Sequence, residues 1–490
     1  MFDQVKKSKL KQMNQITQSL RDSKTARWGA LAVVSFTMMT GYYINYVISP
    51  LKPLFEEYMG WNSQDFGFWN SAYGWFNVFF LMLIFGGIIL DKMGVRFTGK
   101  GAAITMIIGT LLQYAALEKL WPMEGTIFGV DTQIAIGAIG FGIFGVGVEI
   151  AGITVSKIIV KWFKGKELAL AMGLEMATAR LGTALALALP LPIAKWLHFP
   201  APQEIVDKVH NKAEYLLDMG DGTFHMYNVS APVMLGLGLL VAGLVAFLWY
   251  TTMDNKLEKS EGIKDEVSEE DKFKFSDILF IIKNKGFWLI ALLCVLFYSG
   301  VFPFLYFATD LMINKYHVDP DFAGTIPGLL PFGTILLTPL FGSIYDRKGK
   351  GATIMLIGSV MLLVAHSVFS IPGLNHYILA IGLILFLGVT FSLVPSAMWP
   401  SVPKIIPEKQ LGTAYALIFW VQNWGLMGMP LLIGWALEKY GKTEGVVGYD
   451  YTIPMMIFAT TGFLAIIVAL LLKAEDKKKG YGLELPNIEK

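Results

Sequence analysis

Long apolar runs recur along nearly the whole chain and are separated by short polar segments. A run of about 20 apolar residues is long enough for a helix to cross the hydrocarbon core of a membrane. We therefore predict an all-α membrane protein with about twelve transmembrane helices. The predicted helices occupy residues 28–50, 65–90, 99–117, 132–156, 167–192, 231–252, 286–311, 323–345, 351–371, 377–399, 411–437 and 452–472.

A charged segment divides these helices into six and six. It extends from Asp254 to Asp277 and is the one long polar stretch between predicted helices. We interpret it as a solvated linker that carries a short amphipathic helix from about Phe273 to Ile282. The predicted domains are a basic N-terminal segment (1–27), a first six-helix half (28–253), the linker (254–285), a second six-helix half (286–473) and a tail (474–490).

The composition agrees with a membrane protein and argues against several other classes. Of 490 residues, 54% are hydrophobic and 16% are charged, against about a quarter charged in soluble domains. A net charge of +2 gives no reason to expect a nucleic-acid partner. We find no phosphate-binding G-x-x-x-x-G-K-[ST] loop, no Ser/His/Asp set and no H-E-x-x-H motif. Neither an enzyme nor an ATP-driven pump is therefore expected, and no metal or cofactor.

The distribution of basic residues predicts the orientation. Of the 40 lysines and arginines, 31 fall in segments that share one side of the membrane, and eight fall in segments on the other side. The remaining one, Arg180, lies inside a predicted helix. Because basic residues accumulate in cytosolic loops, both chain ends are predicted to be cytoplasmic.

An internal repeat supports two matching halves. Each copy ends a predicted helix with a glycine, an aspartate, a basic residue and a second glycine, at equivalent places in the two halves. The copies contain Gly87, Asp91, Lys92, Gly94 and Arg96 in the first half, and Gly342, Asp346, Arg347 and Gly349 in the second. We interpret them as latches, in which the glycines permit close packing and a tight turn and the aspartate caps the N-terminus of an adjacent helix. The alternative is an ordinary charged turn.

The two copies resemble the G-x-x-x-D-[RK]-x-G loop of the major facilitator superfamily. That resemblance implies the major facilitator fold, with two pseudo-symmetric six-helix halves. Further stretches are similar to the lysosomal dipeptide transporter branch, the type called major facilitator superfamily domain-containing protein 1. They are Trp162–Gly173, Ala179–Gly182, Val301–Phe304, Trp399–Pro400, Leu411–Tyr415 and Gln422–Asn423. The branch implies facilitated movement of dipeptides, preferentially cationic ones, through a central cavity.

Three ionisable residues inside predicted helices are candidates for a substrate site, because such groups are costly in a membrane and are usually functional. Glu149 lies in the fourth helix, and Glu175 and Arg180 lie in the fifth. At about 1.5 Å rise per residue, Arg180 is near the middle of the membrane, where transporter sites lie. Its guanidinium can hold a carboxylate with two hydrogen bonds, and Glu149 can receive an ammonium group.

The resemblance points to the same residues. Glu149 and Arg180 fall on the dipeptide-binding glutamate and arginine of that branch, whereas Glu175 departs from its pattern. When ionised, the three residues sum to a charge of −1, which favours a cationic ligand or a proton on one glutamate. Uniport and proton coupling therefore both stay open. The structural alternative is a permanent Glu149–Arg180 pair between two helices, which leaves one carboxylate without a partner.

Aromatic and polar residues are expected to line the cavity. Tyr298, Trp399 and Asn423 are the strongest of these candidates, because they fall in or next to the matching stretches. Further candidates are Tyr42, Tyr43, Asn45, Tyr46, Tyr73, Trp75, Asn77, Trp420 and Gln422, although most aromatic residues in membrane helices serve packing. Pro303 is expected to break the seventh helix, and Asp310 to be solvated at its outer mouth.

The sequence thus predicts a secondary transporter that moves dipeptides by alternating access, as a uniporter or with proton coupling. An organic anion, a sugar or a drug is the alternative substrate, and a non-transporting membrane receptor is the alternative class. Short outer loops and the lack of an acidic dileucine signal favour the cytoplasmic membrane of a bacterium-type cell over a lysosomal membrane. This argues against a role for the accessory glycoprotein subunit of the lysosomal relatives. The protein is expected to act as a monomer in the lipid bilayer.

Overall fold

The computed structural model describes residues 20–487, apart from residues 119, 121–122, 128, 164–165, 262–274, 408–409 and 444–447. Most of the described residues are helical, as predicted. Residues 1–19 of the predicted basic segment lie outside the described residues, as does Phe273 in the linker. The described part of the predicted amphipathic helix forms α13 (Phe275–Ile282).

The first half of the chain is a series of long helices with short strands and turns between them. Its elements are η1 (Leu20–Asp22), α2 (Lys24–Tyr46), η2 (Ser49–Leu51), α3 (Lys52–Met59), α4 (Ser63–Ser71), η3 (Ala72–Gly74), α5 (Trp75–Phe79), α6 (Met82–Glu118), β1 (Thr126–Ile127), β2 (Val130–Asp131), α7 (Thr132–Phe163), α8 (Leu168–Ala188), α9 (Pro190–Trp196), β3 (Phe199–Pro200), α10 (Gln203–Lys208), α11 (Lys212–Tyr215), β4 (Leu216–Asp218), β5 (Phe224–Met226) and α12 (Ala231–Glu261). β1 pairs with β2, and β5 lies between β3 and β4 in a small antiparallel sheet.

Within its described residues, the second half consists of helices joined by loops and turns. Its elements are α14 (Lys285–Ser299), α15 (Phe302–Tyr316), α16 (Pro320–Ala323), α17 (Thr325–Lys348), α18 (Gly351–Ser370), α19 (Tyr377–Ile405), α20 (Leu411–Ala436), the π-helix η5 (Leu437–Gly441) and α21 (Thr452–Lys479).

Eleven helical segments of the described residues are long and apolar enough to cross a membrane. The prediction differs from the structure at the second helix, which is divided into α4, η3, α5 and the start of α6. The predicted third helix is the rest of α6. Gly94, with φ of 73°, joins the two arms. Gly86 before it lies against Ile150 of α7, and Met106 after it lies against Gly147 of α7, so the chain reverses at Gly94. When α4, η3, α5 and the first arm of α6 are taken as one crossing and the second arm as another, the eleven segments give the predicted twelve crossings.

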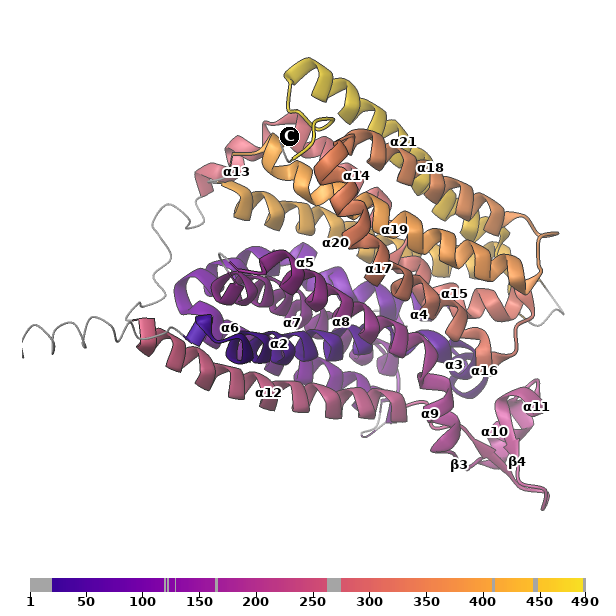
Figure 1. Cartoon of the computed structure of the whole chain (residues 1–490). Coiled ribbons are helices and arrows are strands. Elements are labelled where there is room, and N and C mark those ends of the chain that lie inside the picture. Colours follow the sequence, from indigo (N-terminus) through magenta and orange to yellow (C-terminus); the bar gives the residue numbers. More distant parts are fainter. Residues whose placement is uncertain are drawn as a thin grey trace, which may run out of the picture.

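The helices form two bundles, one from each half of the chain (Figure 1). Those from α2 to α12 form the lower bundle in the figure, and those from α14 to α21 form the upper one. α2 begins at Lys24, α12 ends at Glu261 and α21 ends at Lys479, all on the left of the view. We call this side the terminal face. The opposite side, which carries β3, β4, α10 and α11, is called the far face.

Glycines allow α6 and α7 to pack closely. A β-carbon at Gly109 would come within 2.4 Å of the backbone nitrogen of Phe144 and 2.5 Å of the carbonyl oxygen of Gly140. In a membrane, helices associate mainly through close packing. Small residues allow this, because they let two helix backbones approach each other. Gly101, also on α6, has no such neighbour within 4 Å.

Gly109→Ala is therefore expected to destabilise the protein, because its new methyl group meets backbone atoms that cannot turn aside. We expect a cost of about 1–3 kcal/mol and a lower Tm in a thermal-denaturation measurement in detergent. Gly101→Ala is the matched control on the same helix and is expected to leave Tm unchanged or slightly raised. Equal Tm values for the two variants would show that the close α6–α7 contact is not needed.

The seventh predicted helix is broken, as expected from Pro303. α14 ends at Ser299, and α15 begins at Phe302 with Pro303 in its first turn. The carbonyl oxygen of Gly300, at the break, accepts a hydrogen bond from Nε2 of His366 at 2.7 Å. A broken helix in a membrane needs such a partner for its freed backbone groups.

The two halves are in close contact near the far face. Gly67 of α4 lies against the backbone of Pro430 in α20, and Gly324 lies against the last turn of α8. Nearer the terminal face, Gly173 of α8 and Gly342 of α17 have no atom within 4 Å of where a β-carbon would stand. Figure 1 agrees, since the bundles converge at α3, α15 and α16 and diverge towards the terminal face. The structure is thus closed at the far face.

The residues after α21 fold back onto the second half at the terminal face. The backbone N–H of Lys350 donates to the carbonyl of Glu484 at 3.0 Å. Nδ2 of Asn487 donates to Oδ1 of Asp346 at 2.8 Å. The tail predicted at 474–490 therefore begins as the end of α21 and continues as an ordered strap on the loop between α17 and α18. We call residues 480–487 the C-terminal strap.

Candidate functional site

Glu149 lies on α7 and points towards the boundary between the two halves. A β-carbon at Gly145, one turn earlier, would come within 2.3 Å of the carbonyl oxygen of Tyr73, so the glycine brings η3 close to α7. As a result, the Tyr73 hydroxyl donates to Oε1 of Glu149 at 2.7 Å. Asn423 of α20 lies near this carboxylate. Glu149 thus has a hydrogen-bond donor from the first half and a polar neighbour from the second.

Arg180 lies on α8 among three aromatic rings. Its guanidinium carbon is 5.4 Å from the ring centre of Tyr42, 5.2 Å from Phe302 and 5.1 Å from Phe391. Tyr42 belongs to the first half, and the other two belong to the second. Aromatic faces attract a cation without neutralising it. Among the described residues, Arg180 forms no ion pair with a carboxylate, so the alternative of a permanent Glu149–Arg180 pair is not the arrangement in this structure.

Tyr298 and Trp399 form a second polar group beside Arg180. Nε1 of Trp399 donates to the Tyr298 hydroxyl at 3.0 Å, and the Tyr298 ring packs edge-on against Phe391. Arg180, Tyr298 and Phe391 line a cavity of about 50 Å³ between α8, α14, α17 and α19. The structure therefore brings Arg180 and Tyr298 into one cavity at the boundary of the halves.

Glu175 is placed differently from the other two ionisable residues. The side of α8 that lines the cavity carries Gly173, Met176, Ala177 and Arg180, and Glu175 is not on it. Glu175 lies two turns before Gly182, which packs against the backbone of Met39 in α2. Glu175 thus lies on the side of α8 that faces α2, close enough to Arg180 for their charges to interact. Its role in binding stays a prediction.

The latch residues of the first half make their contacts within that half. Oδ1 of Asp91 accepts a hydrogen bond from Nζ of Lys157 in α7 at 3.0 Å. Arg96 donates to Glu258 of α12 at 2.8 Å. Lys92 is exposed. In the part of the chain that the structure describes, Asp91 does not cap a neighbouring helix.

In the second half, the C-terminal strap binds the latch aspartate, Asp346, and Arg347 is exposed. Gly94 and Gly349 have φ of 73° and 69°, so both make the predicted tight turns. Gly87 and Gly342 have open space around them. The close packing expected of these two glycines is therefore not made in this state, and a latch role stays a prediction.

Sequence reasoning did not single out Phe302 and Phe391. Helical spacing does not relate Phe302 to Tyr298, because the helix is broken between them, and phenylalanine is common in membrane helices. The expectation for Asp310 was wrong. It is buried and ion-paired with Lys52, whereas solvation at the mouth of the seventh helix was predicted. A signal for this pair was available, because Lys52 and Asp310 end the first helix of each half.

No group of three or more histidine, cysteine, aspartate or glutamate residues that could hold a metal ion occurs within the described ranges. The single cysteine, Cys294, is buried on α14.

A family model described as Major Facilitator Superfamily matches residues 31–427, with a second match at residues 311–486. The chain belongs to the Major Facilitator Superfamily. Proteins of this superfamily are membrane transporters and not enzymes, so the predictions of a multi-pass membrane protein and of a transporter are confirmed. Two six-helix halves that work by alternating access are the architecture of this superfamily.

Curated relatives include the lysosomal dipeptide transporters MFSD1 of Danio rerio and Homo sapiens. The Danio rerio protein is 26% identical over 440 residues, which cover 87% of this chain and 82% of the relative. The human protein is 25% identical over 427 residues, which cover 86% and 80%. The predicted resemblance to this branch of the superfamily is confirmed.

Solved structures with the same fold include a nucleoside transporter and a xylose transporter. The nucleoside transporter NupG matches with a TM-score of 0.62 and 13% identity, over 92% of this chain and 99% of that chain. The xylose transporter XylE from E. coli, in an inward open conformation, matches with a TM-score of 0.63 and 14% identity, over 91% and 95%. At these identities the likeness shows the fold alone.

Proposed function

We propose that the protein is a secondary transporter of dipeptides that prefers cationic ones. One observation carries this proposal. Arg180 offers an unpaired guanidinium at the boundary of the halves, while Glu149 offers a separate carboxylate nearby. A dipeptide has a carboxylate and an ammonium group at a fixed separation, so it can satisfy both at once. The names of the MFSD1 relatives support the same substrate class.

In this proposal, the substrate's carboxylate binds Arg180 between the aromatic rings, and its ammonium group binds Glu149 beside Tyr73. Tyr298, Trp399 and Asn423 enclose the substrate from the second half. Because residues of both halves contact the substrate, the halves rock about the site, and the cavity opens to one face at a time. Glu175 adds a second negative charge, which favours a cationic side chain or takes up a proton during transport.

An organic anion is the second candidate substrate. The unpaired Arg180 favours it, because a carboxylate ligand would neutralise this cation. Glu149 and Glu175 oppose it, since two carboxylates near one guanidinium leave an excess of negative charge. A zwitterionic or cationic dipeptide meets all three charges better.

We further propose that the terminal face is cytoplasmic. The segments with the predicted excess of basic residues include the end of α7, with Lys157 and Lys161, and the last turn of α21, with Lys477, Lys478 and Lys479. The membrane proposed is the cytoplasmic membrane of a bacterium-type cell. The protein is proposed to act there as a monomer, since each half already packs on the other within one chain.

Thermal-shift binding of the purified protein in detergent tests the substrate class. At a ligand concentration 100 times Kd, binding adds about 2.7 kcal/mol to the free energy of unfolding and raises Tm. Lys-Ala and Ala-Lys are expected to raise Tm more than Ala-Ala, and free lysine is expected to have little effect. A dicarboxylic acid and xylose serve as the competing classes. A rise in Tm with either of these, and none with any dipeptide, would contradict the proposal.

A further inference from the structure

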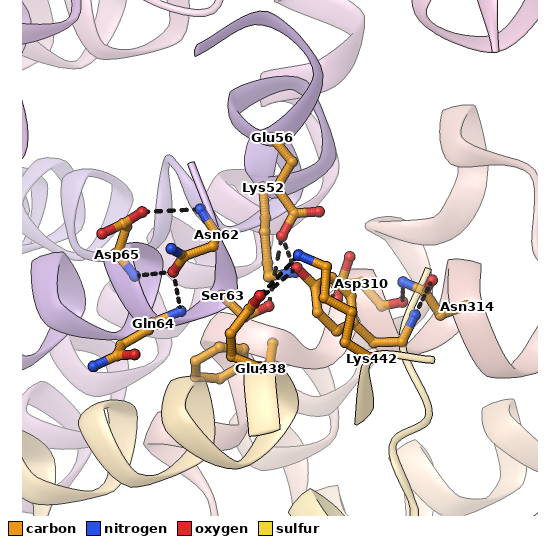
Figure 2. Close-up of polar contacts among 12 residues, drawn as sticks. Lys52, Glu56, Asn62, Ser63, Gln64, Asp65, Asp310, Asn314, Glu438 and Lys442 are labelled. Atoms are coloured by element: carbon orange, nitrogen blue, oxygen red, sulfur yellow. Dashed lines mark hydrogen bonds and ion pairs between the residues drawn. The ribbon is translucent and has the colours of Figure 1, made fainter. Parts of the chain in front are cut away.

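Lys52 and Asp310 form a buried ion pair between the two halves of the chain. Lys52 begins α3 in the first half, and Asp310 lies in α15 of the second. Nζ of Lys52 is 2.9 Å from Oδ2 of Asp310, and the side chains are 0% and 1% exposed. Figure 2 shows the two side chains pointing at each other from elements of different bundles. The substrate site proposed above does not use this pair.

Further groups enclose the Lys52 ammonium. Oε1 of Glu56 accepts a second hydrogen bond from it at 2.8 Å. The ring centre of Tyr449 is 4.3 Å away, at a distance suited to a cation–π contact. The hydroxyl of Tyr451 donates to Oδ2 of Asp310. Lys52, Glu56, Asp310, Tyr449 and Tyr451 are called the ammonium cage below.

The cage lies where the two halves meet. Within the second half, Asn314, one turn after Asp310, accepts at Oδ1 from the backbone N–H of Tyr449 at 3.0 Å, which links this tyrosine to α15. The ring of Tyr46 in α2 packs against Tyr306 in α15, with ring centres 4.9 Å apart. Any movement that opens the far face must therefore separate Lys52 from Asp310.

We propose that the ammonium cage is the far-face gate of the transporter, and that the Lys52–Asp310 pair holds the far-face-closed state. The proposal rests on one part of the transport cycle proposed above, namely that the two halves separate at the far face. It does not depend on which solute is carried.

The charges of the cage explain how a gate of this kind works. Two carboxylates share one ammonium group, and Glu56, which is 22% exposed, already reaches solvent. Asp310 and Glu56 also border a cavity of about 670 Å³ at the far face, together with Glu57 and Glu214. When the halves separate, water from this cavity can hydrate the carboxylates. Removing the ammonium alone leaves Asp310 buried without a counter-ion in the closed state, which destabilises that state and not the open one.

The chain provides a matched control for this pair. Lys195 of α9 and Asp321 of α16 also join the two halves at the far face, with Nζ and Oδ2 2.7 Å apart. These side chains are 36% and 46% exposed. Exposed pairs contribute little because both charges are hydrated in either state. Loss of the Lys195–Asp321 pair is therefore expected to leave the gate closed.

Cysteine labelling of the full-length protein measures the gate without any substrate. Ala184 of α8 is 2% exposed, and its carbonyl faces Gly328 of α17 across the boundary near the far face. Ala184→Cys, on a Cys294→Ser background, reports opening of this face through its rate of reaction with a charged maleimide. Gly173→Cys, in the open region nearer the terminal face, reports the opposite movement.

Four chains are compared on each reporter: the background alone, Lys52→Met, Lys52→Met with Asp310→Asn, and Lys195→Met. Lys52→Met keeps the bulk of the side chain and removes its charge. It is expected to raise labelling at Ala184→Cys by at least about tenfold and to lower labelling at Gly173→Cys. The double variant removes one buried charge and keeps a partner for Tyr451, so labelling is expected to return towards the background rate. Lys195→Met is expected to label as the background does.

The double variant also controls for folding, since it carries the same Lys52→Met change. If Lys52→Met labels at the background rate, the proposal is overturned. It is equally overturned if the single and double variants label alike, because then bulk and not charge holds the gate. Failure of dipeptides to bind would contradict the proposed function and leave the labelling result unaffected, so the two can be told apart.

Discussion

Replacing Arg180 by alanine is expected to weaken dipeptide binding by about 30-fold or more and to abolish measurable uptake. In the structure, no carboxylate of the described residues neutralises this guanidinium, and three aromatic rings hold it in place. The proposed bond to the substrate's carboxylate is charge-assisted and shielded from water. Truncating one partner of such a pair costs about 2–5 kcal/mol, and each 1.4 kcal/mol is a factor of ten in affinity. Arg180→Lys keeps the charge but loses the two-pronged geometry, so its loss should be intermediate.

A matched ligand separates this role from a general effect on the site. An Ala-Lys dipeptide with an amidated C-terminus lacks the carboxylate and should bind the unaltered protein weakly. In Arg180→Ala, the free and amidated dipeptides should bind equally well, as measured by isothermal titration or by thermal shift. If Arg180→Ala still distinguishes the two ligands, another residue binds the carboxylate.

Replacing Glu149 by glutamine is expected to lower the affinity for dipeptides with a free N-terminus by about 10-fold or more. The amide has the same shape and can still accept the hydrogen bond from Tyr73. Only the negative charge is lost, and a hydrogen bond to a charged group contributes about 1.5–3 kcal/mol. The variant is therefore expected to fold normally and to keep the unaltered protein's Tm without ligand.

N-acetylated dipeptides test the position of this charge. They lack the α-ammonium group, so Glu149→Gln should change their affinity little. Arg180→Ala should still lower their affinity, because they keep the carboxylate. If Glu149→Gln lowers the affinity for free and acetylated dipeptides equally, Glu149 either binds the cationic side chain of the substrate or stabilises the fold. Competitive uptake of labelled Ala-Lys in proteoliposomes gives the required comparison.

The helices and the central residues were predictable from the sequence for simple physical reasons. Apolar runs must be helical in lipid, because no water is present to satisfy backbone groups. Glu149 and Arg180 stood out because charge inside such a run is rare and costly. Their neighbours Phe302 and Phe391 did not stand out, since a phenylalanine in a membrane helix looks the same whether it packs on a helix or on a guanidinium. Only the fold shows that both rings face Arg180.

The division of the second helix was not predictable from hydropathy. Residues 65–90 are apolar enough to be one helix, yet the structure interrupts it at η3 and again at Leu81. The interruption places Tyr73 against α7, and this contact depends on Gly145, which lies more than 70 positions away in the sequence. Hydropathy is a local property, whereas this break results from a contact between distant segments.

Lys52 and Asp310 show a second limit of reasoning along the chain. Each lies beside a polar stretch at the end of an apolar run, so each was treated as belonging to solvent. The structure buries them together because the two halves meet there. Counting the charges in each loop cannot detect an ion pair between the two halves. Comparing equivalent positions of the two halves can detect it.

The C-terminal strap bears on how the protein can be handled in the laboratory. Asn487 binds Asp346, so the strap's last described residue is in direct contact with the last turn of α17. A fluorescent protein or affinity handle joined directly after this point would strain this contact. A label attached at the start of the chain avoids this strain, and a long flexible spacer at the other end would relieve it.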